Sequence, residues 1–220
     1  DISAHWQGRP AIRPLEDGGL RLASNGASAG EVPEQADLIS CDHTADAVTA
    51  RWHLRRGDVT VEATYVLRLW GKSLVLDSVA PGGAVAAVVH GQVSGLAGAR
   101  SVTMPYYDYG KSRPALVVAG STAADRLFVS AHTDWYRSNG SELYGIGAVP
   151  DGTAAANGGV NYISKTDGRR NDCFERFFIT VSPRVEDHLP TIANPPSPHK
   201  HITGTKVWRS HGASADRDRD

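Results

Sequence analysis

A period of two in hydrophobicity runs through residues 48–69 and limits what this chain can fold into. Every second residue from Val48 to Leu54 is apolar, and Arg55-Arg56-Gly57-Asp58 follows as a turn. Every second residue from Val59 to Leu69 is again apolar, with mostly polar residues between. Successive side chains of a strand point to opposite faces, so the pattern predicts two antiparallel strands that bury one face. Their β-branched and aromatic residues disfavour helix.

Similar strand patterns recur along the chain. They lie at Gly19–Ala23, Leu74–Val79, Val85–Val93, Ala115–Ala119, Leu127–Ala131, Gly159–Ile163 and Phe174–Val181. We expect His90-Gly91 to form a bulge within one strand. Phe174–Val181 is apolar enough to be a central strand covered on both faces. Ser138–Tyr144 could make one helical turn, but no sustained helical period is present. The prediction is an all-β fold, a large antiparallel β-sandwich.

The chain of 220 residues fits one such sandwich, which we assign to residues 1–188. Residues 189–220 are predicted to form a Pro-rich linker or strap and a charged tail, which could be the start of a following domain. Leu189-Pro190 and Asn194-Pro195-Pro196-Ser197-Pro198 cannot pair inside a sheet, because proline lacks the backbone donor. The chain begins at Asp1 without Met, so we expect it to be processed or cut from a longer protein.

The charge balance and the length of the apolar runs argue against two classes of partner. The 23 Lys and Arg residues nearly balance the 24 Asp and Glu residues, which leaves no basic footprint for nucleic acid. No apolar run approaches the roughly 18 residues that a membrane helix needs. We therefore expect neither nucleic acid nor membrane as a partner. Cys41 and Cys173 could form one bridge, but free thiols are the favoured interpretation.

The segment Met104–Pro114 is the most unusual in the chain. It places Tyr106 and Tyr107 next to Asp108, with a further tyrosine, a lysine and an arginine nearby. A sugar offers an apolar C–H face and a hydroxyl edge, and such residues suit both. The alternative is that the tyrosines plug the end of the sandwich.

Two more segments carry candidate carbohydrate-binding residues. Asp134 and Trp135 follow a strand end, where a carboxylate beside an aromatic ring could hold a sugar. Asp134 could instead cap a turn with Trp135 buried. Arg169 lies in the polar stretch Lys165–Asp172, for which a solvated hairpin tip is favoured over a binding loop.

No catalytic residue and no metal or other cofactor is assigned. Candidate carboxylates for acid–base work are Asp108, Asp134, Glu142, Asp167, Asp172 and Glu175. Glycoside cleavage needs two carboxyl groups about 5–10 Å apart, and no pair can be chosen from sequence. His132 and Asp134 with His188 could imitate the facial triad of a non-haem iron oxygenase. His199 and His201 have metal-ligand spacing but no assured third ligand.

The chain resembles the β-rich N-terminal region of large bacterial glycoside-hydrolase-like proteins. The resemblance rests on Gly71–Leu76, Met104–Gly110, Val129–Asn139, Asp167–Asn171 and Trp208–Ala213. In such proteins a galactose-mutarotase-like supersandwich precedes a (β/α)₈ barrel that carries catalysis. The resemblance implies a supersandwich fold and a sugar-related context. It also implies that the catalytic residues would lie beyond Asp220.

The leading hypothesis is therefore an accessory β-sandwich domain of a carbohydrate-active enzyme, non-catalytic alone. It would pack against a following catalytic domain of the same polypeptide and contact carbohydrate. One alternative is that the sandwich itself hydrolyses, cleaves or epimerises a sugar with paired carboxylates. An iron oxygenase and a ligand-free interaction module are the others. The location is left open, with secretion or the periplasm as options.

Overall fold

The structure is a computed structural model in which the chain divides into two units, Asp1–Pro190 and Thr191–Asp220. It describes residues 2–6, 8, 10–24, 27–103, 115–122, 125–134, 136–144, 154 and 158–189, and for residues 24, 27–29, 103 and 115 only the backbone. All of these residues belong to the first unit. The linker and tail predicted for residues 189–220 lie, except for Leu189, outside the described residues.

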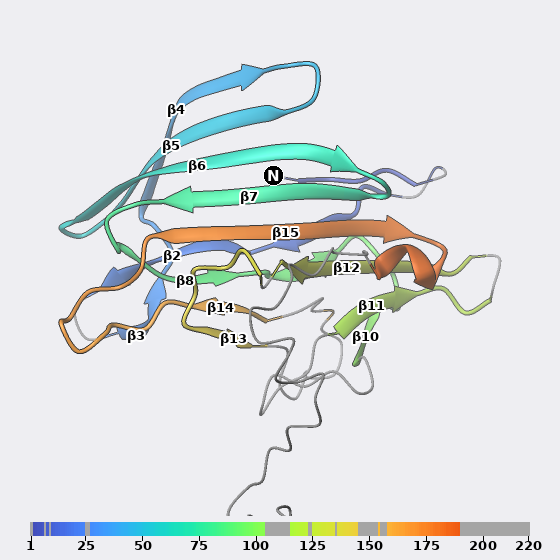
Figure 1. Cartoon of the computed structure of the whole chain (residues 1–220). Helices are drawn as coiled ribbons and strands as arrows, with labels where there is room; N and C mark the ends of the chain where they lie inside the picture. Colours follow the sequence, from blue (N-terminus) through green and yellow to red (C-terminus); the bar gives the residue numbers. More distant parts are fainter. Residues whose placement is uncertain are drawn as a thin grey trace, which may run out of the picture. The chain divides into compact units, whose positions relative to one another are not determined.

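Two antiparallel sheets make up most of the described fold (Figure 1). In the described residues the larger sheet has eight strands, in the order β10 (Arg100–Thr103), β11 (Ala115–Ala119), β12 (Leu127–Thr133), β15 (Cys173–Ser182), β7 (Ser73–Ala80), β6 (Val59–Trp70), β5 (Val48–Arg56) and β4 (Gln35–His43). The smaller has five, in the order β13 (Glu142–Tyr144), β14 (Gly159–Asn161), β8 (Val85–Val89), β2 (Gly19–Ser24) and β3 (Ala27–Glu31). The larger sheet is open, running from β4 at the top of Figure 1 to β10 at the bottom.

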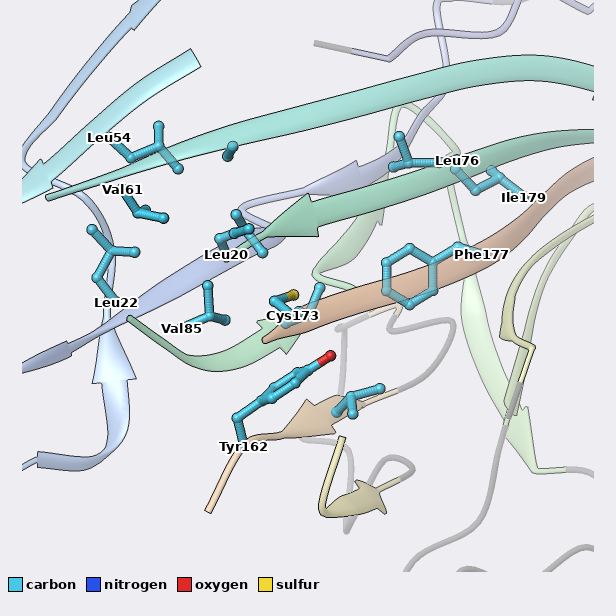
Figure 2. Close-up of a cluster of buried hydrophobic side chains, with 14 residues drawn as sticks. Leu20, Leu22, Leu54, Val61, Leu76, Val85, Tyr162, Cys173, Phe177 and Ile179 are labelled. Atoms are coloured by element: carbon cyan, nitrogen blue, oxygen red, sulfur yellow. The ribbon is translucent and has the colours of Figure 1, made fainter. Parts of the chain in front are cut away.

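The main core lies between these two sheets, as Figure 2 shows. Leu54, Val61 and Phe177 come from the larger sheet and pack with Leu22 and Val85 of the smaller one. Burying side chains of this size stabilises the fold by about 1.5–3 kcal/mol each. The all-β sandwich predicted from the sequence is confirmed.

A second core extends the sandwich beneath β11 and β12. Strand β1 (Arg13–Glu16) pairs with β9 (Gln92–Ser94) in a two-stranded sheet. Ile12 and Val93, next to and within these strands, pack with Val117, Leu127 and Val129. The larger sheet is thus covered on one face by two separate smaller sheets.

Most predicted strands are confirmed. The hairpin β5–β6 pairs residue by residue from Val48↔Leu67 to Arg56↔Val59, and β7, β11, β12 and β15 fall where the alternation placed them. Strand β15 lies in the interior of the larger sheet and is buried on both faces along most of its length, as predicted. Both cysteines are free, Cys41 exposed and Cys173 buried.

Three predictions about local structure are wrong. Val85–Val93 is not one bulged strand: the chain turns at His90 and Gly91, and β8 and β9 join different sheets. Leu69 is 81% exposed, because the core under β6 ends at Leu67. Residues 138–144 form no helical turn and end in strand β13, whereas a short 3-10 helix, η1, spans Val185–His188.

Strand β4 was missed by the sequence pattern. Eight of its nine positions are exposed, so neither face is apolar enough to produce alternation.

In the described part of the chain, no helix is long and apolar enough to cross a bilayer.

Candidate functional site

The face of the larger sheet that points away from the core carries an unusual group of side chains; we call it the outer face. Cys173, Phe177 and Ile179 of β15 lie in the core. Because strand side chains alternate, Arg176 and Phe178 point to the outer face. The same rule, applied through the pairing registers, places side chains of β6, β7 and β12 beside them. We call six of these the outer-face cluster: Arg68, Trp70, Asp77, His132, Asp134 and Arg176.

Asp77 is the charged centre of this cluster. Nε and Nη2 of Arg176 donate to its two carboxylate oxygens at 2.6 and 2.7 Å, and Arg68 Nη1 donates at 2.9 Å. Asp77 and Arg176 are in contact because the register of the β7–β15 pair places them directly opposite each other. Burial raises the pKa of Asp77, but the hydrogen bonds and charges of the two arginines outweigh it, and the pKa lies below its ordinary value.

Asp134 lies on the other side of Arg176, immediately after β12. Its backbone N–H donates to the Arg176 carbonyl, and its own carbonyl accepts from Arg137 and Ser138 in the turn that follows. The side chain is only 6% exposed, and its Oδ2 lies 4.0 Å from Arg137 Nε. Its Oδ1 is buried and has no hydrogen-bond partner among the described residues. A buried polar atom without a partner costs about 1–3 kcal/mol, which marks it as a candidate ligand contact.

His132 offers a second unpartnered atom on the same face, two residues before Asp134. Burial, together with the nearby His188 ring, lowers the pKa of His132 to about 4, so the ring is neutral at pH 7. A hydrogen bond from His132 to the backbone of His188 raises the pKa, so the ring nitrogen that makes this bond is a donor. The other ring nitrogen, Nε2, is buried with no partner among the described residues, and in the neutral ring it is an acceptor.

Aromatic rings adjoin these polar groups. Trp70, at the end of β6, is 46% exposed, and its ring centroid lies 5.4 Å from that of Phe178. Phe178 is opposite His132 in the β12–β15 register. Arg176 also lies over the Phe174 ring, 6.0 Å from its centroid. The outer-face cluster thus combines an exposed aromatic face with buried charges.

Glu175 is buried on the opposite face of the same sheet, inside the core. Its Oε1 accepts hydrogen bonds from Tyr162, whose hydroxyl is 2.5 Å away, and from Ser138 at 2.9 Å. Figure 2 shows Tyr162, which belongs to the main core, lying beneath β15. Burial raises the pKa of Glu175 to about 7, although these hydrogen bonds act to lower it. Because Asp134 and Glu175 lie on opposite faces, they cannot flank one glycosidic bond.

The predicted site residues have different outcomes. Asp134 begins a turn, whose hydrogen bonds its backbone carbonyl accepts, and its side chain belongs to the outer-face cluster. Arg169 is exposed at a loop tip where Lys165 N–H donates to the Arg169 carbonyl, and no contact recorded for the described residues joins it to Asp134. Tyr106, Tyr107, Asp108 and Trp135 lie outside the described residues.

The other candidate carboxylates serve local structure. Glu142 accepts from the Asn161 side chain, Asp167 accepts from the Arg169 backbone, and Asp172 accepts from the Gly82 backbone. In the described ranges, no group of three or more His, Cys, Asp or Glu side chains is placed to hold a metal ion, including the predicted His132, Asp134 and His188 set. His188 instead bonds Ser130 Oγ at 2.8 Å and lies 3.4 Å from the Ser182 carbonyl oxygen. His199 and His201 lie outside the described residues.

Sequence reasoning missed Arg68, Trp70, Asp77 and Arg176. Asp77 carried a usable signal, because a carboxylate inside the apolar run Leu74–Val79 must find a partner when buried. The partner could not be named, since Arg176 lies 99 positions away in the chain.

Comparison with known proteins finds no family model, curated protein or solved structure that matches this chain.

Proposed function

We propose that this chain is an accessory β-sandwich domain of a carbohydrate-active enzyme, and that it contacts glycan through the outer-face cluster. The accessory role, with a following catalytic domain as partner, rests on the sequence resemblance. The contact with sugar rests on one observation: two acceptors on the same face, Asp134 Oδ1 and His132 Nε2, are buried without partners among the described residues.

The chemistry of these atoms favours a polyhydroxylated ligand. Both accept hydrogen bonds, so the ligand must donate. Residues two apart on one strand face are about 6–7 Å apart along the chain, which leaves room for two adjacent hydroxyl groups between the acceptors. A hydroxyl at each position would remove the cost of leaving the acceptor unpaired.

Trp70 supports the same ligand class. Its exposed ring presents an apolar surface to which the C–H face of a sugar can pack. The side chains of Arg68 and Arg176 are 30% and 18% exposed, and their guanidinium groups can donate to hydroxyl oxygens.

Calorimetric titration against plant, mucin and bacterial polysaccharides tests the contact. We expect Asp134→Ala and Trp70→Ala each to weaken binding by about tenfold or more, the loss typical of a hydrogen bond to a charged group or of a buried aromatic contact. Leu69→Ala is the matched control, because Leu69 is 81% exposed and belongs to the other face of the same strand. Thermal unfolding of each variant shows that the fold is kept.

Two results would overturn the contact: no binding of any polysaccharide by the unaltered chain, or equal losses in the Leu69→Ala control and the cluster variants. The accessory role is tested separately by the coding sequence downstream of Asp220. An adjoining catalytic domain would support it. A stop codon at that point, with no catalytic partner that co-purifies, would contradict it.

A further inference from the structure

Strand β4 is an open edge of the larger sheet. It is nine residues long and pairs with β5 on one side only within the described chain. The other edges of the two main sheets are β10, β3 and β13, with four, five and three residues. An unpaired edge presents free backbone N–H and C=O groups that can pair with another strand.

No described part of the chain pairs with this edge. Eight of the nine residues are exposed, and Leu38 and Ile39 are each 52% exposed. None of them belongs to either core, because the smaller sheet does not reach beneath β4. Exposed edges are commonly protected by lysine or proline, and β4 contains neither.

A bulge divides β4 into two halves. The register with β5 shifts between Leu38 and Ser40, and it is regular from Ser40 to His43. In this regular half the side chains alternate: Ser40 lies 3.3 Å from Asp42 on one face, and Cys41 lies 3.6 Å from His43 on the other. The regular half is the part of β4 that can accept a further strand.

We propose that the edge of β4 pairs antiparallel with β4 of a second copy of this chain, about a two-fold axis at Cys41. In that register Ser40 lies opposite Asp42 of the second copy, so the hydroxyl that donates to Asp42 of its own strand can donate instead to the carboxylate of the second copy. Shifting the axis by one residue, to Ser40 or to Asp42, sets Asp42 opposite Leu38 or opposite itself, and both pairings are unfavourable. Each contact away from the axis occurs twice, and the contact between the two Cys41 residues lies on the axis and occurs once.

The proposal places the two Cys41 residues directly opposite each other. Opposed residues of an antiparallel pair have Cα atoms about 4.5–5.5 Å apart, which falls within the range that a disulfide spans. Cys41 is exposed, and Cys173 is buried, so the chain carries its own reporter and its own internal control.

Sedimentation of the 220-residue chain across a concentration series, together with oxidative cross-linking, tests the interface. We expect a reversible dimer. Diamide, which oxidises two thiols to a disulfide and is itself reduced to a hydrazine, should trap that dimer through Cys41. Dithiothreitol should reverse the trapping, Cys41→Ser should abolish it, and Cys173→Ser should leave it intact. Cys41→Lys should shift the chain to monomer, because a lysine on the edge blocks pairing.

Leu69→Lys is the matched control, since it adds the same charge at an exposed position of another strand and should leave the dimer unchanged. A chain that stays monomeric at every concentration would overturn the proposal. So would a dimer that persists in Cys41→Lys, or a monomer in which Cys41 is shielded from thiol reagents by another part of the same chain.

Discussion

At the scale of single residues, the buried polar groups are the most informative. Glu175 is fully buried, yet only one of its carboxyl oxygens has partners. Burial penalises the charged form of a carboxyl group, so its pKa rises to about 7. The pKa of Tyr162, its hydrogen-bond donor, also lies above the ordinary value because of burial. At mildly acidic pH this is a neutral, hydrogen-bonded pair within the core.

Glu175→Gln should change how stability depends on pH. The variant keeps an acceptor oxygen for Tyr162 but cannot titrate. An unfolded Glu carboxyl loses its proton near 4.5, whereas the folded one holds it to about 7. Relative to the variant, the native free energy of unfolding should therefore fall by roughly 3 kcal/mol as pH rises between these values. Urea unfolding of both proteins across this range measures the difference, and a pH-independent difference would contradict the raised pKa.

Asp77→Asn should destabilise the fold through its two arginines. The variant keeps the shape of the side chain but removes the charge that Arg68 and Arg176 share. Removing one partner of a buried ion pair typically costs about 3–5 kcal/mol. Because both arginines are partly exposed, we expect the free energy of unfolding to fall by about 2–4 kcal/mol. Denaturant unfolding at pH 7 measures it. Glu186→Gln, in an exposed pair with Arg184, should leave stability nearly unchanged, and equal effects would refute the argument.

At the scale of strands, the turns decide which sheet each segment joins. The chain leaves β8 at Val89 and enters β9 at Gln92, and Gly91 between them has a φ of +79°. A side chain there would collide with the backbone of Glu16 and Gly18. Both the left-handed conformation and the close approach require glycine, so this residue directs the chain from one sheet to another.

Gly91→Ala should therefore be costly. Backbone strain and overpacking together predict a loss of about 2–4 kcal/mol in the free energy of unfolding. Gly57→Ala is the matched control, because Gly57 has a φ of +54° but no atom within 4 Å of an added Cβ. It should show only the strain of the left-handed conformation, about 1–2 kcal/mol. Losses of equal size in the two variants would show that the close approach contributes nothing.

At the scale of the whole molecule, the larger sheet extends beyond the layer that covers it. Two cores bury the face of its central strands, while β4 stands outside both. This difference puts the two cysteines in opposite environments. Cys173 is 1% exposed, and burial raises its pKa to about 12, whereas Cys41 is exposed on the open edge.

The two thiols should therefore react at very different rates. In dilute native protein, where any dimer is dissociated, an aromatic disulfide reagent should titrate Cys41 rapidly. Cys173 should react only as the sandwich unfolds, because the thiolate is the reactive form and this thiol is buried and protonated. Absorbance of the released thiolate, with and without denaturant, counts the accessible groups. One fast thiol in native Cys41→Ser, or two fast thiols in the unaltered native protein, would contradict the buried position of Cys173.

Local patterns in the sequence were enough to predict antiparallel strands and a sandwich. Alternation along β5 and β6 follows from burial of one face, which is a local property of each strand. The same reasoning failed where burial was absent: β4 has no buried face, and Leu69 continues an apolar pattern past the end of the core. It also failed at Gly91, since the choice of sheet depends on contacts with residues far away in the chain.

The candidate site shows the same division. Asp134 could be singled out from the sequence as a carboxylate at a strand end. The tertiary structure alone decided that it lies beside Arg176, that Arg176 in turn holds Asp77, and that Asp134 Oδ1 is left without a partner. Strand register sets these neighbours, and register depends on the packing of whole sheets. The sequence by itself therefore determined the kind of element and its buried face, and only the packed sheets decided which charges meet.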